Sequence, residues 1–183
     1  MSTATAQPLA VGNWTIDKVH SHVGFAVKHM VVATFRAQFQ DYTGSLSVGE
    51  DGQPRLEGSV KADSIVVKDE NLAAHLRQPD FFDTERFPEI RFTSTAVTVG
   101  EQGELEVDGE LTIKDHTHRV TARGSITGPH TDLAGNDKIG VELEAIVDRR
   151  DYGLEFNAQL PKGGYAVDND VRLDVSLELV REA

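Results

Sequence analysis

Alternation of apolar residues with a period of two is the feature that most constrains this chain, because it recurs about eight times along the sequence. Residues two apart share a face of a β-strand, so each run predicts a strand with one apolar face. Parallel strands are apolar on both faces, so we expect antiparallel pairing. The residues expected to face inward are Val19, Ser21, Val23, Phe25 and Val27; Phe35, Ala37 and Phe39; Leu56, Gly58, Val60 and Ala62; Ile90, Phe92, Ser94 and Ala96; Leu105, Val107, Gly109, Leu111 and Ile113; Val120, Ala122, Gly124 and Ile126; Ile139, Val141, Leu143, Ala145 and Val147; and Val171, Leu173, Val175, Leu177 and Leu179.

Turn-forming residues separate these runs and leave room for one short helix. Breaks rich in Gly and Asp, such as GEDGQP and PKGGYAVDND, indicate loops between strands. The helix is expected within DENLAAHLR, between the third and fourth strands, because Asp69 can cap it and Leu72 and Leu76 share a face. The chain has 183 residues and no repeat, so we expect a flexible segment over residues 1–10 and one domain over residues 11–181.

Eight strands of about ten residues favour an all-β antiparallel barrel, because closure removes the exposed edges of long strands. A sandwich with Greek-key connections is the alternative. The interior of an eight-stranded barrel is either filled by side chains or holds one small ligand. Small inward residues favour a hollow lumen, unless they only let the sheet curl tightly around large side chains. These small residues are Gly58, Ala62, Gly109, Ala122, Gly124 and Ala145.

The connection FFDTERFP, which follows the expected helix, is rich in aromatic residues. Phe81, Phe82 and Phe87 are expected either to close the mouth of the barrel as a lid over a ligand or to form a simple hydrophobic plug.

Charge and composition exclude several classes of function. Lys and Arg total 18 against 30 Asp and Glu, so the formal net charge is −12. Binding of nucleic acid or of an anionic membrane face needs a basic surface, which this balance disfavours. The absence of cysteine excludes disulfides and thiolate nucleophiles. With neither a leader pattern nor an apolar run of about 20 residues, we expect a cytoplasmic protein without a membrane span.

Two histidine pairs were considered as metal ligands. His20 and His22 share a strand face, and His116 and His118 form a second such pair. The first pair is expected on the solvent side and the second in an exposed turn, and no acidic residues stand at a fixed spacing to either. No metal site is therefore expected.

A few polar residues fall at positions where they could meet a ligand. Ser21 and His29 are expected to face inward and orient a headgroup, although His29 is as compatible with an exposed corner at the strand end. In VDRRDYG, Arg149 could bind a ligand oxygen, or the cluster could fix a turn through ion pairs. The sequence has no GxSxG, GxxxxGK[ST], GxGxxG or HExxH signature.

Four segments carry a family resemblance: WTIDKVHSHVGFAVKHM, NLAAHLRQPDFFDTERFPEIRFTST, VDGELTIKDHTHRV and DRRDYG. In their order and content, over roughly residues 11 to 181, the chain resembles the YceI-like family of polyisoprenoid-binding, lipocalin-like proteins. The resemblance implies an extended eight-stranded antiparallel lipocalin-like barrel whose lumen holds a polyprenyl chain, such as that of an isoprenoid quinone. It also implies a homodimer. No cofactor is expected beyond a bound polyisoprenoid lipid.

Two departures from the family pattern stand out. Many members carry a leader, which this chain lacks, and Tyr152 stands where the family often has Phe.

The leading hypothesis is a non-enzymatic carrier or sequestration protein for a long apolar isoprenoid. An alternative is an enzyme (a cyclase, isomerase or dehydratase) that uses the same cavity, with His29, Tyr152 and Asp83 as acid–base candidates. A third is an interaction module that binds partners through its acidic exterior. The expected ligand-binding residues are Ser21, Val23, Phe25, His29, Val60, Phe81, Phe82, Phe87, Phe92, Leu111, Val141, Arg149, Tyr152 and Leu173.

Overall fold

The computed structural model describes residues 9–183, so most of the expected flexible segment over residues 1–10 lies outside the described residues. The strands are β1 (Gly12–Ile16), β2 (His22–His29), β3 (Ala33–Phe39), β4 (Tyr42–Val48), β5 (Pro54–Lys61), β6 (Ile65–Val66), β7 (Glu89–Val99), β8 (Glu104–Ile113), β9 (His116–Thr131), β10 (Asp137–Asp148) and β11 (Val167–Arg181). The helices are α1 (Glu70–Leu76) and the 3-10 turns η1 (Lys18–His20), η2 (Ala62–Ser64) and η3 (Arg149–Tyr152).

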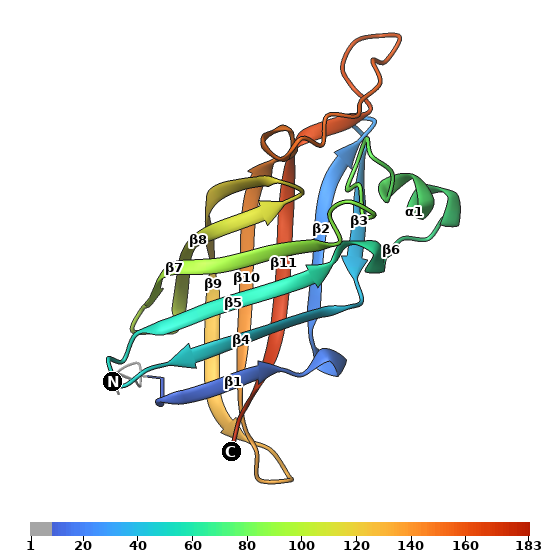
Figure 1. Cartoon of the computed structure of the whole chain (residues 1–183). Coiled ribbons are helices and arrows are strands. Elements are labelled where there is room, and N and C mark those ends of the chain that lie inside the picture. Colours follow the sequence, from blue (N-terminus) through green and yellow to red (C-terminus); the bar gives the residue numbers. More distant parts are fainter. Residues whose placement is uncertain (1–8) are drawn as a thin grey trace.

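The strands form one antiparallel sheet that closes on itself, as Figure 1 shows. The closing strand is β11, which pairs with β2 over residues 167–176 and with β1 over residues 179–181. Strands β1 and β2 are therefore two halves of one long strand interrupted by η1. The pairs β3–β4 and β5–β6 are interrupted in the same way, because β4 pairs with β5 while β3 pairs with β6. Within residues 9–183 the sheet is thus a barrel of eight long strands, which confirms the expected fold.

The alternation expected at Val19 and Ala96 is wrong. Val19 lies in η1 and is 84% exposed, because its backbone N–H donates to the Asp17 carboxylate and turns the chain out of the strand. In β7 a register shift between Ser94 and Ala96 reverses the alternation, so Ala96 is exposed and Val97 takes the inward position.

The short helix lies where it is expected, between the third and fourth long strands. The Asp69 carboxylate accepts a hydrogen bond from the Leu72 backbone N–H at 2.8 Å and caps the first turn. Ala73 and Leu76 are buried on the face that α1 turns to the barrel. We call the end of the barrel next to α1 the upper end (Figure 1).

The interior has two hydrophobic clusters. The lower cluster is built around fully buried Trp14 and contains Leu46, Leu56, Leu105, Val107, Ile139, Val141, Leu143, Leu177 and Leu179. The upper cluster contains Ala37, Phe39, Ile65, Leu76, Phe81, Phe82, Leu111, Ile113, Val147, Tyr152 and Leu154. Phe92 packs against both. A Cβ on Gly109 would collide with the Phe92 ring, so the glycine gives this aromatic ring its place between the clusters.

Candidate ligand cavity

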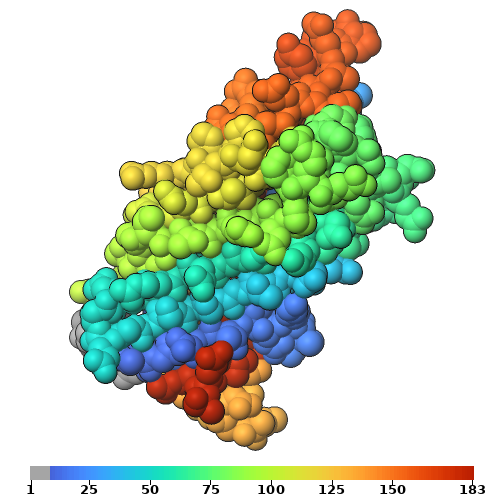
Figure 2. All heavy atoms as spheres, in the orientation of Figure 1, coloured from blue at the N-terminus to red at the C-terminus, as the bar shows by residue number. Residues whose placement is uncertain are grey.

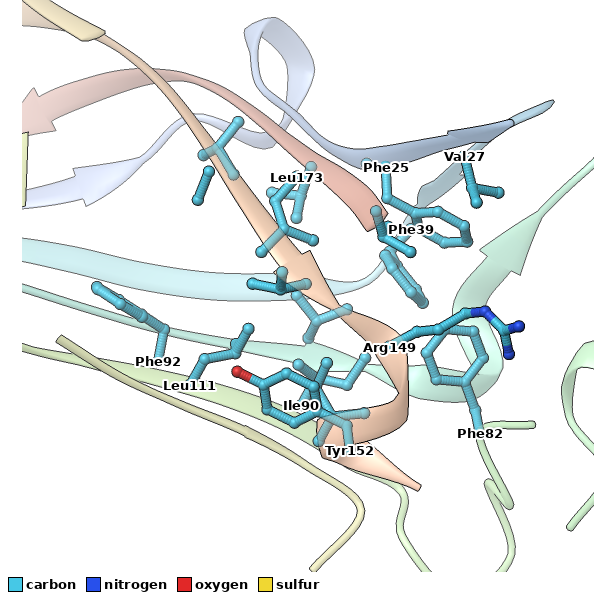
Figure 3. Close-up of a pocket in the computed structure, with 18 of the residues that line it drawn as sticks. Phe25, Val27, Phe39, Phe82, Ile90, Phe92, Leu111, Arg149, Tyr152 and Leu173 are labelled. Carbon is cyan, nitrogen blue, oxygen red and sulfur yellow. The ribbon is translucent and has the colours of Figure 1, made fainter. Parts of the chain in front are cut away.

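A cavity of about 630 Å³ occupies the upper part of the barrel. Side chains from the inner face of the closed sheet, from α1 and from the segment after η3 form its wall, which is almost entirely apolar. Small-molecule sites in proteins have volumes of roughly 300–1,000 Å³ and bury most of the ligand in such walls. Figure 3 shows side chains from β2, β3, β7, β8, β10 and β11 converging on this space.

Aromatic rings form the part of the wall nearest α1. The Phe25 ring lies 6.3 Å from the Phe35 ring and 6.1 Å from the rings of Phe39 and Phe82. Phe39 and Phe82 meet edge to face at 5.9 Å. Such tilted and edge-on pairs are the favourable arrangement of aromatic side chains. Phe82 thereby fixes the FFDTERFP connection against the upper wall of the barrel.

A second aromatic group lies at the mouth. The His75 ring of α1 lies 5.0 Å from the rings of both Phe81 and Phe156, and these two phenyl rings lie 5.1 Å apart. Phe156 is 37% exposed, so this group borders the solvent. It joins α1 to the segment after η3 at the edge of the cavity.

Arg149 is buried at the upper end, with a side chain that donates to backbone oxygens. Its Nε donates to the Asp168 carbonyl at 2.8 Å, and Nη1 donates to the carbonyls of Leu154 and Phe156. Nη2 donates to the Asn169 side-chain oxygen at 3.4 Å and to the Val167 carbonyl. Burial lowers the pKa of the Arg149 guanidinium. The guanidinium therefore fastens residues 154–169 to the barrel, and its donors are already used.

Tyr152 presents a hydroxyl group within the cavity wall. The residue is 1% exposed, and its Oη has no hydrogen-bond partner among the described residues. Figure 3 shows the ring turned toward Leu111 and Ile90, away from Arg149. The His118 ring packs edge-on against it at 5.2 Å. Burial raises the pKa of the Tyr152 phenol to about 12, so it stays neutral over the whole physiological range.

The sequence matches the YceI-like domain over residues 14–179. The chain belongs to the YceI-like family. The UPF0312 protein SA2479 of Staphylococcus aureus (strain N315) is 30% identical over 169 residues, covering 91% of this chain and 96% of that protein.

Solved structures share the fold of this YceI-like barrel. BcnA of Burkholderia cenocepacia superposes with a TM-score of 0.75 at 17% identity, covering 89% of this chain and 98% of that one. A polyisoprenoid-binding domain from Saccharophagus degradans, described as implicated in plant cell wall breakdown, superposes with a TM-score of 0.69 at 13% identity. That match covers 94% of this chain and 100% of the other.

Most of the residues expected to bind a ligand lie in the wall of the YceI-like cavity: Val23, Phe25, His29, Val60, Phe81, Phe82, Phe92, Leu111, Arg149, Tyr152 and Leu173. Ser21, Phe87 and Val141 lie elsewhere. Ser21 lies just before β2, and its Oγ accepts from the Glu178 backbone N–H at 2.9 Å. Val141 is part of the lower cluster, and the Phe87 ring packs under Arg86.

The structure does not bring the three acid–base candidates together. His29 lies at the exposed end of β2, where it borders the mouth of the cavity, and Tyr152 lies in the wall. Asp83 is 4% exposed, accepts a hydrogen bond from Arg86 at 3.3 Å and is not part of the wall.

Several wall residues were not among the expected ligand-binding residues. Phe35 and Phe39 lie in a strand whose alternation already predicts that both face inward, so the sequence alone could have identified them as wall residues. Leu72, Leu76 and Phe156 come from α1 and the segment after η3, where no strand pattern indicates which side chains turn to the lumen.

A polar cluster at the lower end contains His20, a member of the first histidine pair. Asp17, His20 and Glu178 hold potential ligand atoms within 4.8 Å of one another. The Lys138 ammonium lies 2.6 Å from Glu178 Oε1 and 3.8 Å from Asp17 Oδ2, so the cluster already contains a cation. The His20 ring N–H donates to the Asp17 carboxylate, and this hydrogen bond raises the pKa of His20. Glu178 was missed because it is remote in sequence, whereas Asp17 stands only three residues before His20, a spacing that the sequence does contain.

Among the described helices, none is long and apolar enough to cross a membrane.

Proposed function

We propose that this protein binds a long apolar isoprenoid in the cavity and carries or sequesters it. The observation that carries the proposal is the apolar cavity of about 630 Å³, open at the upper end and bounded below by the packed cluster around Trp14. Membership of the YceI-like family and the fold shared with a polyisoprenoid-binding domain support it.

The volume sets the length of chain that the cavity can enclose. At about 30 Å³ for each water-sized group, it holds on the order of twenty non-hydrogen atoms, or about four isoprene units. Burial of an apolar chain is worth about 0.8 kcal/mol per CH₂ before the loss of chain entropy is subtracted. A longer cargo therefore leaves its remaining length and its headgroup at the mouth, beside His29.

An isoprenoid quinone is the proposed form of the cargo, because it combines a polyprenyl tail with a headgroup that accepts hydrogen bonds. The Arg149 donors are engaged by the chain itself, and the rest of the cavity wall is almost entirely apolar. A quinone oxygen is thus more easily accommodated than an anionic diphosphate, which would need a free cation.

Native mass spectrometry after gentle purification tests this proposal directly. We expect a co-purified lipid, or, after delipidation, binding of added geranylgeraniol and of a polyprenyl quinone. Ala122→Leu and Ala145→Leu place bulk in the cavity wall and should reduce binding by about tenfold or more. Ala96→Leu makes the same change at an exposed position of β7 and should leave binding unchanged. A wild-type protein that neither retains lipid nor binds either probe would overturn the proposal.

The homodimer and the cytoplasmic location remain predictions. Analytical ultracentrifugation of the full chain tests the first, with a mass of twice 20.0 kDa expected. Fractionation of cells that express the native gene tests the second.

A further inference from the structure

Exposed apolar side chains gather at the mouth of the cavity. The tip of the β2–β3 hairpin carries Met30, Val31 and Val32, and the hairpin after η3 carries Phe156 and Tyr165. Val32 is 85% exposed, Val31 67% and Tyr165 60%. We call these five residues the mouth patch. Figures 1 and 2 show the segment around residue 160, in orange, projecting beyond the upper end of the barrel.

The two hairpins form one continuous surface. The Met30 backbone N–H donates to the Ala166 carbonyl at 2.8 Å. A Cβ on Gly164 would lie 3.7 Å from Val31 Cγ2, in ordinary van der Waals contact. His29 and Phe156, at the bases of the two hairpins, line the cavity itself. The mouth patch therefore forms part of the rim of the cavity opening.

The backbone conformation at the tip of the β2–β3 hairpin is unfavourable for Met30 and Val31. Met30 has φ +52° and Val31 has φ +67°, in the left-handed region that a β-branched side chain adopts only under strain. Asn and Gly are the residues that such hairpin turns prefer. The stability of the turn thus does not account for Met30 and Val31, and strained, exposed apolar residues at a rim are a typical mark of a functional surface.

The charge of these hairpins differs from that of the rest of the chain. Residues 28–40 contain Lys28 and Arg36 and no Asp or Glu, and residues 156–167 contain Lys162 and no Asp or Glu. The whole chain has a net charge of −12. Charges beyond about 8 Å are largely screened at physiological salt, so a projecting basic tip can approach an anionic surface that the acidic barrel as a whole would avoid.

We propose that the mouth patch docks on the surface of a lipid bilayer, with its apolar side chains inserted at the interface and Lys28 and Lys162 at the level of anionic headgroups. Exposed apolar residues flanked by lysines are the combination that binds such interfaces. Docking turns the open end of the cavity to the bilayer, so that an isoprenoid can pass between membrane and lumen without crossing water. This role of docking in cargo exchange rests on the proposed function, whereas the docking itself does not.

Co-sedimentation of the full chain with vesicles tests the proposal. We expect binding to vesicles of phosphatidylcholine with phosphatidylglycerol, and weaker binding to phosphatidylcholine alone. Val32→Asp should reduce the affinity by about tenfold or more, because it replaces an inserted apolar side chain with a charge. Lys28→Gln and Lys162→Gln should each reduce it by about fivefold.

The matched control is Leu133→Asp. Leu133 is fully exposed in the loop between β9 and β10 at the lower end, and its substitution should leave vesicle binding unchanged. Equal losses in Leu133→Asp and Val32→Asp would overturn the proposal, since they would indicate a non-specific hydrophobic effect. A wild-type protein that binds neither kind of vesicle would also overturn the proposal.

A second copy of this chain is the competing occupant of the mouth patch. In that case Val32→Asp would convert a dimer into a monomer, as measured by analytical ultracentrifugation, while vesicle binding was absent or unchanged. That result overturns membrane docking. Binding of geranylgeraniol without vesicles separates the two proposals: Val32→Asp should retain it, and its absence in the wild type would contradict the carrier function but not the docking.

Discussion

The Nε of Arg149 lies 2.8 Å from the carbonyl oxygen of Asp168, and this hydrogen bond joins the end of β10 to the start of β11. Other donors of the same guanidinium engage the carbonyls of Leu154 and Phe156. The segment that borders the cavity mouth is thus held by one buried cation whose partners are mainly backbone oxygens. Its rigidity depends on a residue that does not itself need to touch the cargo.

Arg149→Met should therefore destabilise the protein. Several buried carbonyls lose their donor, which costs about 1–3 kcal/mol for each group left unsatisfied, so we expect a loss of about 3 kcal/mol in the free energy of unfolding. Urea denaturation followed by circular dichroism measures it. Arg150→Met is the control, because Arg150 is exposed and pairs with Asp148, so its substitution should lower the free energy of unfolding by about 1 kcal/mol at most. Equal effects of the two substitutions would contradict this account of Arg149.

Removal of the hydroxyl group should change the free energy of unfolding in opposite directions at Tyr152 and Tyr42. Tyr152 Oη is buried without a partner in the part of the chain that the structure describes, so Tyr152→Phe should raise the free energy of unfolding by about 1 kcal/mol. Tyr42 Oη donates to the Ser21 carbonyl at 2.8 Å, so Tyr42→Phe should lower it by about 1 kcal/mol. Thermal unfolding of the delipidated variants compares them. Destabilisation by Tyr152→Phe would mean that its hydroxyl has an acceptor in solution.

The alternation in the sequence predicts which face of a strand is buried, but not the height of a residue along the barrel. Leu173 and Val141 were both expected to line the lumen, yet only Leu173 does, because Val141 lies among the packed side chains around Trp14. Aliphatic residues of the same types line the hollow upper half of the barrel and fill its lower half. What differs is the three-dimensional position of Trp14 and Phe92, which depends on how the sheet closes.

The interruptions of the long strands were equally hidden in the sequence. Asp17 captures the backbone N–H of Val19 and produces η1 where the pattern indicates a strand. Tyr42, Leu46 and Val48 alternate as β4 requires, but Gly44 and the preceding Gln–Asp break conceal the run. Local side-chain hydrogen bonds of this kind compete with strand pairing. Periodicity alone does not show which of the two is more stable.

The pH dependence of stability should contain a contribution from Asp148. A hydrogen bond from the Arg150 side chain lowers the pKa of the Asp148 carboxyl from 3.8 to about 2. Because the pKa is lower in the folded state, the stabilisation is complete above pH 3.8 and is lost as the pH falls toward 2. Carboxyl NMR titration should give a midpoint near 2 for Asp148 and a higher one in Arg150→Met. Asp148→Asn should flatten the acid limb of the curve of melting temperature against pH.

Substitution of Val31 can separate the effect of the mouth patch on the stability of the fold from its effect on vesicle binding. Its φ of +67° strains a β-branched residue by roughly 1–2 kcal/mol, whereas Asn tolerates this conformation. Val31→Asn should therefore raise the free energy of unfolding by about 1 kcal/mol while weakening vesicle binding. Val32→Asn is the matched control, since Val32 is the same residue type and even more exposed but has no positive φ.

We expect Val32→Asn to weaken vesicle binding without the gain in stability. Thermal melts and vesicle co-sedimentation on the same preparations provide both quantities. If Val31→Asn gained stability and kept full vesicle binding, the strained valine would have no role in docking, because the interface would not need its side chain. If both quantities changed as expected, the turn would be an instance of stability given up for a functional surface, which explains why a β-branched residue stands where Asn or Gly would fold more easily.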